Sequence, residues 1–388
     1  MSGIVFSGIS KSYSGREVLD LPELTIPESS LTVLCGPAAS GKSVLLRLLV
    51  GLETPDRGRI LIGGADVTAL SAAQRRVGYV PQTFALFPHM SVFENIAFPL
   101  RMQGVATAVI TRRVGQAAEI LRIGGLLAKS PSQLSGGEKQ RVAIARGMLK
   151  DAIVFVLDDP LVGLDFKLRE ALMDDLKDMR VQLGATFLYA TSDSLEALTM
   201  AEQLVVLDGG HVIEQGSVDA IYHQPTQLRS MELIGFPRCN VINGRITDRR
   251  CVTDLADIEF DLVSAVGTVS EAPMAVAVAV AVRPEAIVYR PEGKPAAGIL
   301  GVGRITLVEN LGAESVIYFE TAELGLVSIP STGQVAHLDV GDDYPFAIEP
   351  GSLAVFAASD GRYLGCGRPS AAPGVLSGRT MLENTGGE

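Results

Sequence analysis

Hydrophobic residues follow two different patterns along the chain. Over residues 1–235, short runs of Val, Ile and Leu alternate with longer stretches of helical periodicity. This alternation is typical of an α/β layer built on a largely parallel sheet. After residue 235 the helical periodicity ends, and runs such as 274–282, 303–308 and 314–319 are rich in Val, Ile and Ala. The pattern predicts an α/β domain over 1–235, a small all-β barrel or sandwich over 236–370, and a flexible tail over 371–388.

Composition adds an excess of apolar residues and a net negative charge. The 388 residues are 47% hydrophobic with a mean hydropathy of +0.29. No run approaches the roughly 20 apolar residues that cross a bilayer, and the first residues lack the features of a secretion signal. The 33 Lys and Arg against 44 Asp and Glu give a charge of −11, which argues against a nucleic-acid partner. We therefore expect a cytoplasmic chain without a membrane span.

A phosphate loop at residues 36–43 is the clearest motif. It reads Gly-Pro-Ala-Ala-Ser-Gly-Lys-Ser, fits G-x-x-x-x-G-K-[ST], and lies between an apolar run at 31–34 and a helical run at 44–52. Backbone N–H groups of such a loop wrap the phosphates, and the helix N-terminus adds positive potential. Lys42 is expected to reach the β- and γ-phosphates, and the Ser43 hydroxyl to ligate Mg²⁺. The predicted nucleotide contacts are Gly36, Pro37, Ala38, Ala39, Ser40, Gly41, Lys42, Ser43 and Val44.

Two further motifs select one class of phosphate-loop protein. Residues 134–141, the signature segment, read Leu-Ser-Gly-Gly-Glu-Lys-Gln-Arg, and their two adjacent glycines open a helical run. Residues 154–159 form an apolar run that ends in Asp158 and Asp159. In this order behind a phosphate loop, the motifs resemble those of the ATPase subunits of ABC transporters. A phosphate-loop kinase would not explain the signature segment, and ABC-type ATPases of DNA or ribosomes carry insertions or basic linkers that this chain lacks.

The resemblance implies a fold, two cofactors and a set of site residues. It implies an α/β ATPase domain with a helical subdomain, an OB-like β domain after it, and binding of ATP with Mg²⁺. Asp158 would hold the Mg²⁺ through water. In this family the signature segment contacts the γ-phosphate of ATP on the opposite subunit, and residues 164–165 resemble a loop that contacts that subunit. The residues expected to serve the partner's nucleotide are Ser135, Gly136, Gly137 and Gln140.

The resemblance extends to positions outside these motifs. Tyr13 stands where the family places an aromatic ring against adenine, and Val18 would line the same pocket. Gln82 resembles the glutamine that senses Mg²⁺ and the attacking water. Residues 84–90 and Asn95 resemble the segment that forms a groove for a helix of the membrane subunit, although an apolar cluster beside a proline is often plain core.

The second domain resembles one subgroup of these ATPases. Residues 282–285 (Val-Arg-Pro-Glu) and 308–312 (Val-Glu-Asn-Leu-Gly) resemble motifs of ATPases that drive sugar, polyol and glycerol-phosphate importers. The implied partners are a second ATPase subunit, two membrane permeases that dock near 84–95 and, indirectly, a solute-binding protein. The implied location is the cytoplasmic face of the cell membrane. Glycerol is the first solute to test, and the β domain could regulate, dimerise or only stabilise.

Two positions depart from the family where the chemistry takes place. Asp159 stands where the family has a Glu that polarises the attacking water, and Ser192 stands where it has a His. The shorter carboxylate falls roughly 1 Å back, and a misplacement of that size can cost about 10²-fold in rate. Ser192 cannot carry a positive charge or reach as far as an imidazole. We therefore expect weak hydrolysis at this chain's own site and pairing with a consensus ATPase, whose competent site this chain's signature segment completes.

Two other functions are compatible with the same residues. The chain could be a fully active, homodimeric sugar-importer ATPase in which both changes are tolerated. It could also be a regulatory subunit that binds nucleotide without turnover. The intact phosphate loop and signature segment are compatible with each alternative.

Overall fold

The chain divides into two compact units, Met1–His223 and Gln224–Glu388. The computed structural model describes residues 2–150, 152–247, 250–253, 259–264, 276–290, 299–321 and 324–368. The domain boundary after residue 235 stays a prediction. The predicted tail 371–388 and the first two residues of the predicted strand 274–282 lie outside the described residues. Within the described part, no helix combines the length and the apolar character needed to cross a membrane.

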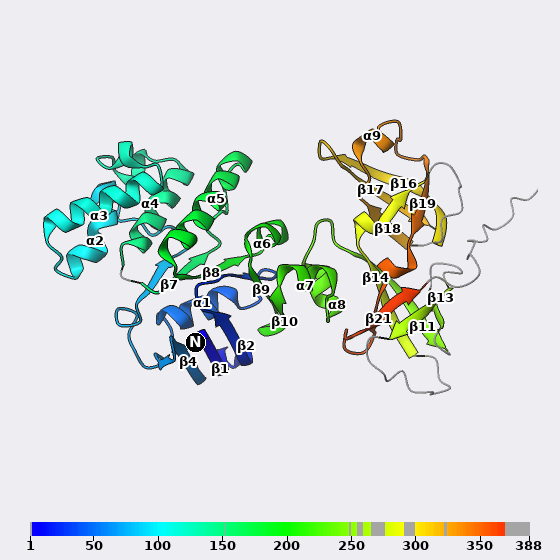
Figure 1. Cartoon of the computed structure of the whole chain (residues 1–388), viewed down its shortest axis with the longest axis horizontal. Helices are drawn as coiled ribbons and strands as arrows, with labels where there is room; N and C mark the ends of the chain where they lie inside the picture. The colour runs from blue at the N-terminus through cyan, green and yellow to red at the C-terminus, as the bar shows by residue number, and fades with distance from the viewer. Residues whose placement is uncertain are drawn as a thin grey trace, which may run out of the picture. The chain divides into compact units, whose positions relative to one another are not determined.

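A six-stranded sheet forms the centre of the first unit (Figure 1). In spatial order its strands are β10 (His211–Ser217), β9 (Gln203–Asp208), β3 (Leu31–Cys35), β8 (Thr186–Thr191), β7 (Val154–Asp158) and β6 (Val77–Val80). From β9 to β6 the strands are parallel, while β10 is antiparallel to β9. Every residue of β3, β7 and β8 is buried, because helices cover both faces of a parallel sheet.

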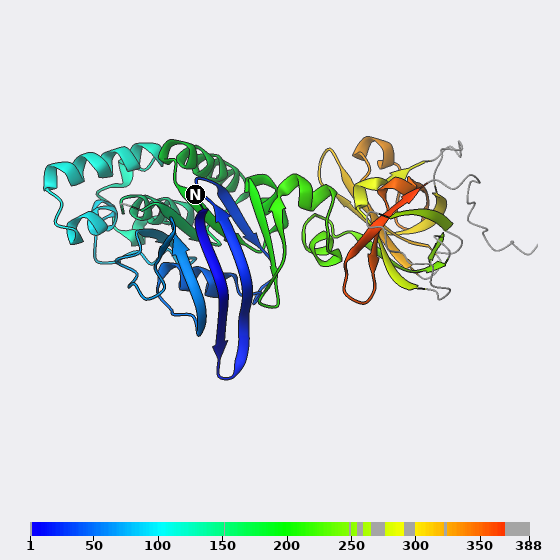
Figure 2. The same cartoon turned by 60° about the horizontal axis from the view of Figure 1, so that its bottom comes forward.

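A second, antiparallel sheet lies across helix α1 (Lys42–Val50) from the central one. Its strands are β2 (Arg16–Pro27), β1 (Ser2–Tyr13), β4 (Arg57–Ile62) and β5 (Ala65–Asp66). The long β1–β2 hairpin (dark blue in Figure 2) turns at Ser14 and Gly15, which both have positive φ as a two-residue hairpin turn requires. Side chains from both sheets and from α1 share one hydrophobic core, so the hairpin is held beside the phosphate loop.

The remaining helices of the first unit fall into two groups. Helices α2 (Val92–Met102), α3 (Thr107–Ile120) and α4 (Gly136–Met148) pack on one another and form the helical subdomain (Figure 1). Helices α5 (Phe166–Leu183), α6 (Ser194–Met200) and α7 (Val218–His223) follow strands of the central sheet. Polar caps set several of these starts; Ser91, for example, caps α2 in a capping box with Glu94.

The second unit is almost entirely β structure. A closed barrel contains β11 (Asn240–Thr247), β12 (Arg250–Thr253), β13 (Glu259–Ser264), β21 (Tyr363–Arg368), β20 (Ala354–Ala357) and β14 (Val276–Val282). A five-stranded sheet contains β15 (Ile287–Tyr289), β19 (Asp343–Ile348), β16 (Ile299–Asn310), β17 (Ser315–Thr321) and β18 (Leu324–Ser328). The short helices are α8 (Leu228–Leu233) and α9 (Thr332–Val335). The predicted fold class, an α/β unit followed by an all-β unit, is confirmed.

Arg75 anchors the end of α1 that lies opposite the phosphate loop. Its buried guanidinium donates hydrogen bonds to the carbonyls of Leu48 (2.5 Å) and Leu49 (3.1 Å) at the end of the helix. It also donates to the carbonyls of Leu70 and Thr68 in the following loop. The end carbonyls of a helix have no partner within it, so Arg75 supplies partners that buried backbone needs.

We expect Arg75→Leu to lower the free energy of unfolding by about 3 kcal/mol, because the buried carbonyls of Leu48 and Leu49 lose the guanidinium as a donor. Urea unfolding of the full chain measures this difference. Arg59→Leu is the matched control, since Arg59 is exposed on β4 and such surface changes stay within about 0.5 kcal/mol. Equal destabilisation by the two variants would contradict the anchoring role of Arg75.

Candidate nucleotide site

The phosphate loop connects β3 to α1 in a path that two glycines make possible. A Cβ on Gly36 would lie 1.9 Å from the carbonyl oxygen of Leu207, so only glycine fits beside β9. Gly41 has φ 104° and precedes α1, where a Cβ would lie 2.6 Å from Leu19 Cδ2. The loop therefore wraps tightly around the start of α1, whose free N–H groups and dipole favour an anion.

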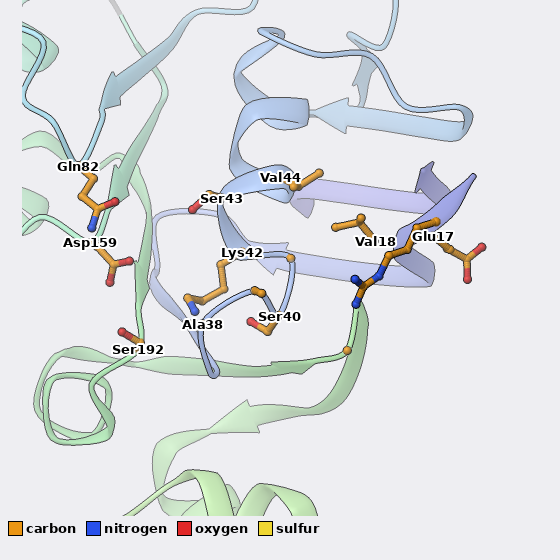
Figure 3. A pocket seen from close by; sticks show the side chains of 14 residues that line it. Glu17, Val18, Ala38, Ser40, Lys42, Ser43, Val44, Gln82, Asp159 and Ser192 are labelled. Carbon is orange, nitrogen blue, oxygen red and sulfur yellow. The ribbon is translucent and has the colours of Figure 1, made fainter. Parts of the chain in front are cut away.

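A cavity of about 650 Å³ lies at this loop (Figure 3). The cavity gathers residues from the hairpin, the phosphate loop and the ends of other strands. They are Arg16, Glu17, Val18, Ala38, Ala39, Ser40, Gly41, Lys42, Ser43, Val44, Gln82, Asp159, Ser192 and Gly209. The predicted residues Gln82, Asp159 and Ser192 thus lie in one cavity with most of the phosphate loop.

The topology of the central sheet explains this gathering. Gln82 follows β6, Asp159 follows β7 and Ser192 follows β8, while the phosphate loop follows β3. These are four neighbouring parallel strands, so their carboxyl ends share one edge of the sheet. Ligands of open α/β sheets bind at this edge.

Lys42 is the cation at the centre of the cavity. It is 5% exposed, and its Nζ donates to the carbonyl oxygens of Gly36 (2.7 Å) and Pro37 (2.9 Å). Burial lowers the pKa of Lys42, and the carboxylate of Asp159 partly opposes this shift. Neutral carbonyls satisfy the ammonium only weakly compared with a charged oxygen. The side chain is therefore placed to donate to a phosphate oxygen, which is a stronger partner.

Ser43 and Asp158 bring two hard oxygen donors together. Ser43 Oγ donates to Asp158 Oδ1 at 3.0 Å, and Tyr79 donates to Asp158 Oδ2 at 3.4 Å. Asp158 is 6% exposed at the end of β7. Burial, followed by the charge of Asp158, raises the pKa of Tyr79 to about 12. A hydroxyl and a carboxylate beside a phosphate loop are the ligand types that Mg²⁺ prefers, so these residues fit that ion.

Asp159 and Ser192 lie on the wall of the cavity together with Gln82 (Figure 3). Burial raises the pKa of Asp159, whereas Lys42 and the backbone N–H of Ser192 lower it. In the described part of the chain, Asp159 Oδ1 is buried and has no hydrogen-bond partner. Asp159 has φ 45°, a left-handed conformation that Asp tolerates better than most residues. A free carboxylate oxygen of this kind could accept a hydrogen bond from a ligand or a water molecule.

Tyr13 does not line the cavity. Its ring is 40% exposed at the end of β1, and its hydroxyl donates to Glu53, which is paired with Arg47 at 2.6 Å. The adenine contact expected for Tyr13 stays a prediction. The hairpin instead contributes Arg16, Glu17 and Val18, of which only Val18 was predicted. Gly209, also missed, follows β9 at the same edge of the sheet as the phosphate loop, a position that the parallel-strand pattern could have indicated.

The signature segment lies outside this cavity. Ser135 caps α4: its Oγ accepts the N–H of Glu138 at 3.3 Å, and its N–H donates to the Glu138 carboxylate at 2.7 Å. Gly136 is exposed, whereas Gly137 is buried. Gln140 is 0% exposed, and neither atom of its amide has a hydrogen-bond partner in the described residues. The nucleotide contact expected for Gln140 stays a prediction, and in this fold the amide is buried.

A second cavity of about 460 Å³ adjoins the segment predicted to meet a membrane subunit. It is lined by Val50, Val77, Gly78, Tyr79, Pro81, Ala85, Phe87, Phe98, Pro99, Arg146, Gly147 and Lys150. Asn95 is buried beneath it and organises the segment: Oδ1 accepts the N–H of Phe87 at 2.8 Å, and Nδ2 donates to the carbonyls of Phe87, Met90 and Ser91. Asn95 therefore shapes the segment rather than presenting its own side chain.

Comparison with known proteins agrees with this geometry. The family described as ABC transporter matches residues 19–162, and the TOBE domain family matches residues 280–356. The Vibrio cholerae protein named spermidine/putrescine import ATP-binding protein PotA is 41% identical over 260 residues, which cover 66% of this chain and 68% of that protein. The Burkholderia pseudomallei protein named sn-glycerol-3-phosphate import ATP-binding protein UgpC is 38% identical over 258 residues, covering 66% and 72%.

A solved structure places the first unit among nucleotide-binding cassettes. The dimeric, post-hydrolysis structure of the ATP-binding cassette MJ0796 bound to ADP and Pi covers 55% of this chain and 98% of its own, with a TM-score of 0.52 and 27% identity. Fold and cavity thus define a phosphate-loop ATPase. The chain belongs to the ABC transporter family, as an ATP-binding subunit with a C-terminal TOBE domain.

Proposed function

We propose that this chain binds and hydrolyses ATP to drive an importer of small organic solutes, at the cytoplasmic face of the membrane. The observation that carries the proposal is the single cavity that joins the phosphate loop to Gln82, Asp159 and Ser192. Relatives of this chain are named import ATP-binding proteins. The implied partners are two permeases, a solute-binding protein and a second ATPase subunit.

Within this cavity we assign each group one task. Lys42 exchanges its loop carbonyls for the β- and γ-phosphate oxygens, and the N–H groups at the start of α1 bind the same phosphates. Ser43, Asp158 and Gln82 would hold Mg²⁺, which neutralises charge on the phosphates during transfer. Val18 and the neighbouring hairpin residues Arg16 and Glu17 are placed to meet the nucleoside.

We infer that hydrolysis at this site is weak. Asp159 Oδ1 is the unpartnered acceptor that a general base must present, but the carboxylate stands on a side chain one methylene shorter than Glu. Ser192 offers a neutral hydroxyl at the position where the family places an imidazole. Loss of one charged or donor group of this kind typically costs about 10²–10³ in rate. ATP would therefore stay bound at this chain's own site and be hydrolysed there only slowly.

We infer that the second ATPase subunit is a different chain. Ser135, Gly136 and the start of α4 lie outside this chain's own cavity, which suits a role at a partner's nucleotide. A consensus partner would supply its own Glu and His to the site that this signature segment completes. Native mass spectrometry of the purified transporter tests the proposal: one copy of this chain with one copy of another ATPase is expected, and two copies of this chain would contradict it.

The transported solute must be determined by measuring uptake. PotA and UgpC are named for solutes of opposite charge at nearly equal identity to this chain, and the ATP cavity does not touch the solute. The motifs of the β domain favour a small carbohydrate or polyol, with glycerol first, and the likeness to PotA makes polyamines the second candidate. Uptake of labelled glycerol, sn-glycerol 3-phosphate and spermidine should be compared in cells with and without this chain. If cells without this chain take up all three solutes as fast as cells with it, both candidates are contradicted.

A further inference from the structure

We propose that the first turn of α5, through Leu168 and Arg169, couples the signature segment to the Asp159–Ser192 wall of the chain's own cavity. The inference rests on the proposed function, in which these two regions serve two different nucleotides. Neither Leu168 nor Arg169 lines the nucleotide cavity, so both act as positioning residues. Neighbouring in sequence, they contact the two regions separately.

Leu168 makes the contact with the signature segment. A Cβ on Gly137 would lie 2.0 Å from Leu168 Cδ2, so the leucine methyl group packs directly on the Cα of that glycine. A second attachment ties the same two helices together, since Arg141 of α4 pairs with the buried Asp175 of α5 at 3.5 Å. These two contacts connect α4 with α5 at separate points along the helices.

Arg169 makes the contact with the segment that contains Ser192. Its Nη1 lies 3.2 Å from Asp193 Oδ2, and its Nε lies 3.8 Å from Glu196 Oε1. Burial raises the pKa of Glu196, hydrogen bonds from Thr191 and Tyr189 oppose this shift, and the charge of Arg169 adds to that opposition. One guanidinium thus lies beside two acids, the N-cap of α6 and a residue of its first turn.

Asp193 connects Arg169 with Ser192, its neighbour in the sequence. Its carboxylate caps α6 by accepting the N–H groups of Leu195 (2.9 Å) and Glu196 (3.2 Å), and its own N–H donates to Thr191 Oγ1 (3.0 Å). Ser192 is therefore fixed on both sides. Its backbone N–H in turn acts on the carboxyl group of Asp159, whose pKa it lowers.

A side-chain cap holds the turn that carries both contacts. Asp165 caps α5, and its Oδ1 accepts the N–H of Leu168 at 3.0 Å. A shift of Gly137 when the signature segment meets a nucleotide would be transmitted through this turn to Asp193 and Ser192. Displacements near 1 Å at reacting groups change rates by about 10²-fold, so a small movement is sufficient.

A double-mutant cycle in the complete transporter tests the coupling. ATP turnover is measured for the wild type, Lys42→Ala, Arg169→Gln and the double variant. In the wild type we expect Lys42→Ala to lower turnover at least fivefold, the lower end of ordinary coupling between sites. In the Arg169→Gln background the same change should lower it less than twofold. Equal factors in both backgrounds would overturn the proposal.

Three further variants separate coupling from loss of structure. Arg180→Gln is the matched control, because Arg180 pairs with Glu202 from the other end of α5 and should leave the Lys42 factor unchanged. Leu168→Ala should weaken the factor as Arg169→Gln does, and Arg169→Lys should restore most of it. ATP binding by the isolated chain reports on the proposed function alone. If ATP binds equally well with and without Lys42, the proposed function is contradicted. If binding needs Lys42 but Lys42→Ala lowers turnover by the same factor in both backgrounds, only the coupling is contradicted.

Discussion

Lys42→Ala should weaken ATP binding by the isolated chain by roughly 10²-fold or more. The ammonium is nearly fully buried, and truncating one partner of a buried charge pair costs about 2–5 kcal/mol. The variant also leaves the Asp158 and Asp159 carboxylates in the cavity without the cation that acts on both. A phosphate would then meet two like charges. Isothermal titration with ATP and Mg²⁺ measures the difference.

Lys150 provides a matched control for this experiment. Its Nζ also donates to two backbone carbonyls, of Ala72 (3.2 Å) and Val77 (2.8 Å), and burial lowers its pKa as it does for Lys42. Lys150 lines the second cavity rather than the nucleotide cavity. Lys150→Ala should therefore change stability by a similar amount while ATP affinity stays within about twofold. A comparable loss of affinity in both variants would mean that Lys42 acts only through the fold.

The double change Asp159→Glu with Ser192→His should raise hydrolysis at this chain's own site by about 10²-fold. The longer carboxylate reaches further into the cavity toward the attacking water, and the imidazole adds a donor that can be charged. The measurement is phosphate release by the purified transporter after the partner ATPase has lost its catalytic Glu. Under that condition only the own site contributes to turnover.

The two single variants serve as controls for the gain. The two groups act on the same transition state, so their effects on the hydrolysis rate should not be additive in free energy. Each single variant should give less than half of the logarithm of the double variant's rate gain. ATP binding should stay within a few fold, since neither residue belongs to the phosphate loop. If the wild-type site already hydrolyses ATP as fast as the double variant, the inference of an impaired site is wrong.

The phosphate loop could be predicted because its residues form one contiguous motif, and the two-unit fold because the hydrophobic pattern changes at one point of the chain. Contacts at Gly36 and Gly41 leave no room for a side chain, so the motif itself carries the geometry. The gathering of Gln82, Asp159 and Ser192 in one cavity followed from the resemblance, not from the residues. Its physical cause is the strand order, and hydrogen-bonded pairing across the sheet leaves no mark in a single sequence.

The surroundings of Tyr13 and Gln140 could not be predicted, for a different reason. The hydroxyl of Tyr13 bonds to Glu53, a residue forty positions away, and the hydrophobic pattern around either residue contains no sign of that contact. Gln140 lies on α4 at a position whose burial depends on which helices cover it. Motif membership indicates where a residue stands along the chain, whereas accessibility is decided by packing.

The bonds of Lys42 to its own loop make nucleotide binding an exchange of acceptors. The amine gives up the carbonyls of Gly36 and Pro37 when it turns to a phosphate, so affinity reflects only the difference between the two sets of bonds. That difference grows with the charge of the incoming oxygen. Nucleotides should therefore be ranked at this loop by the charge that they bring to the amine, and an uncharged analogue of the same shape should gain almost nothing there.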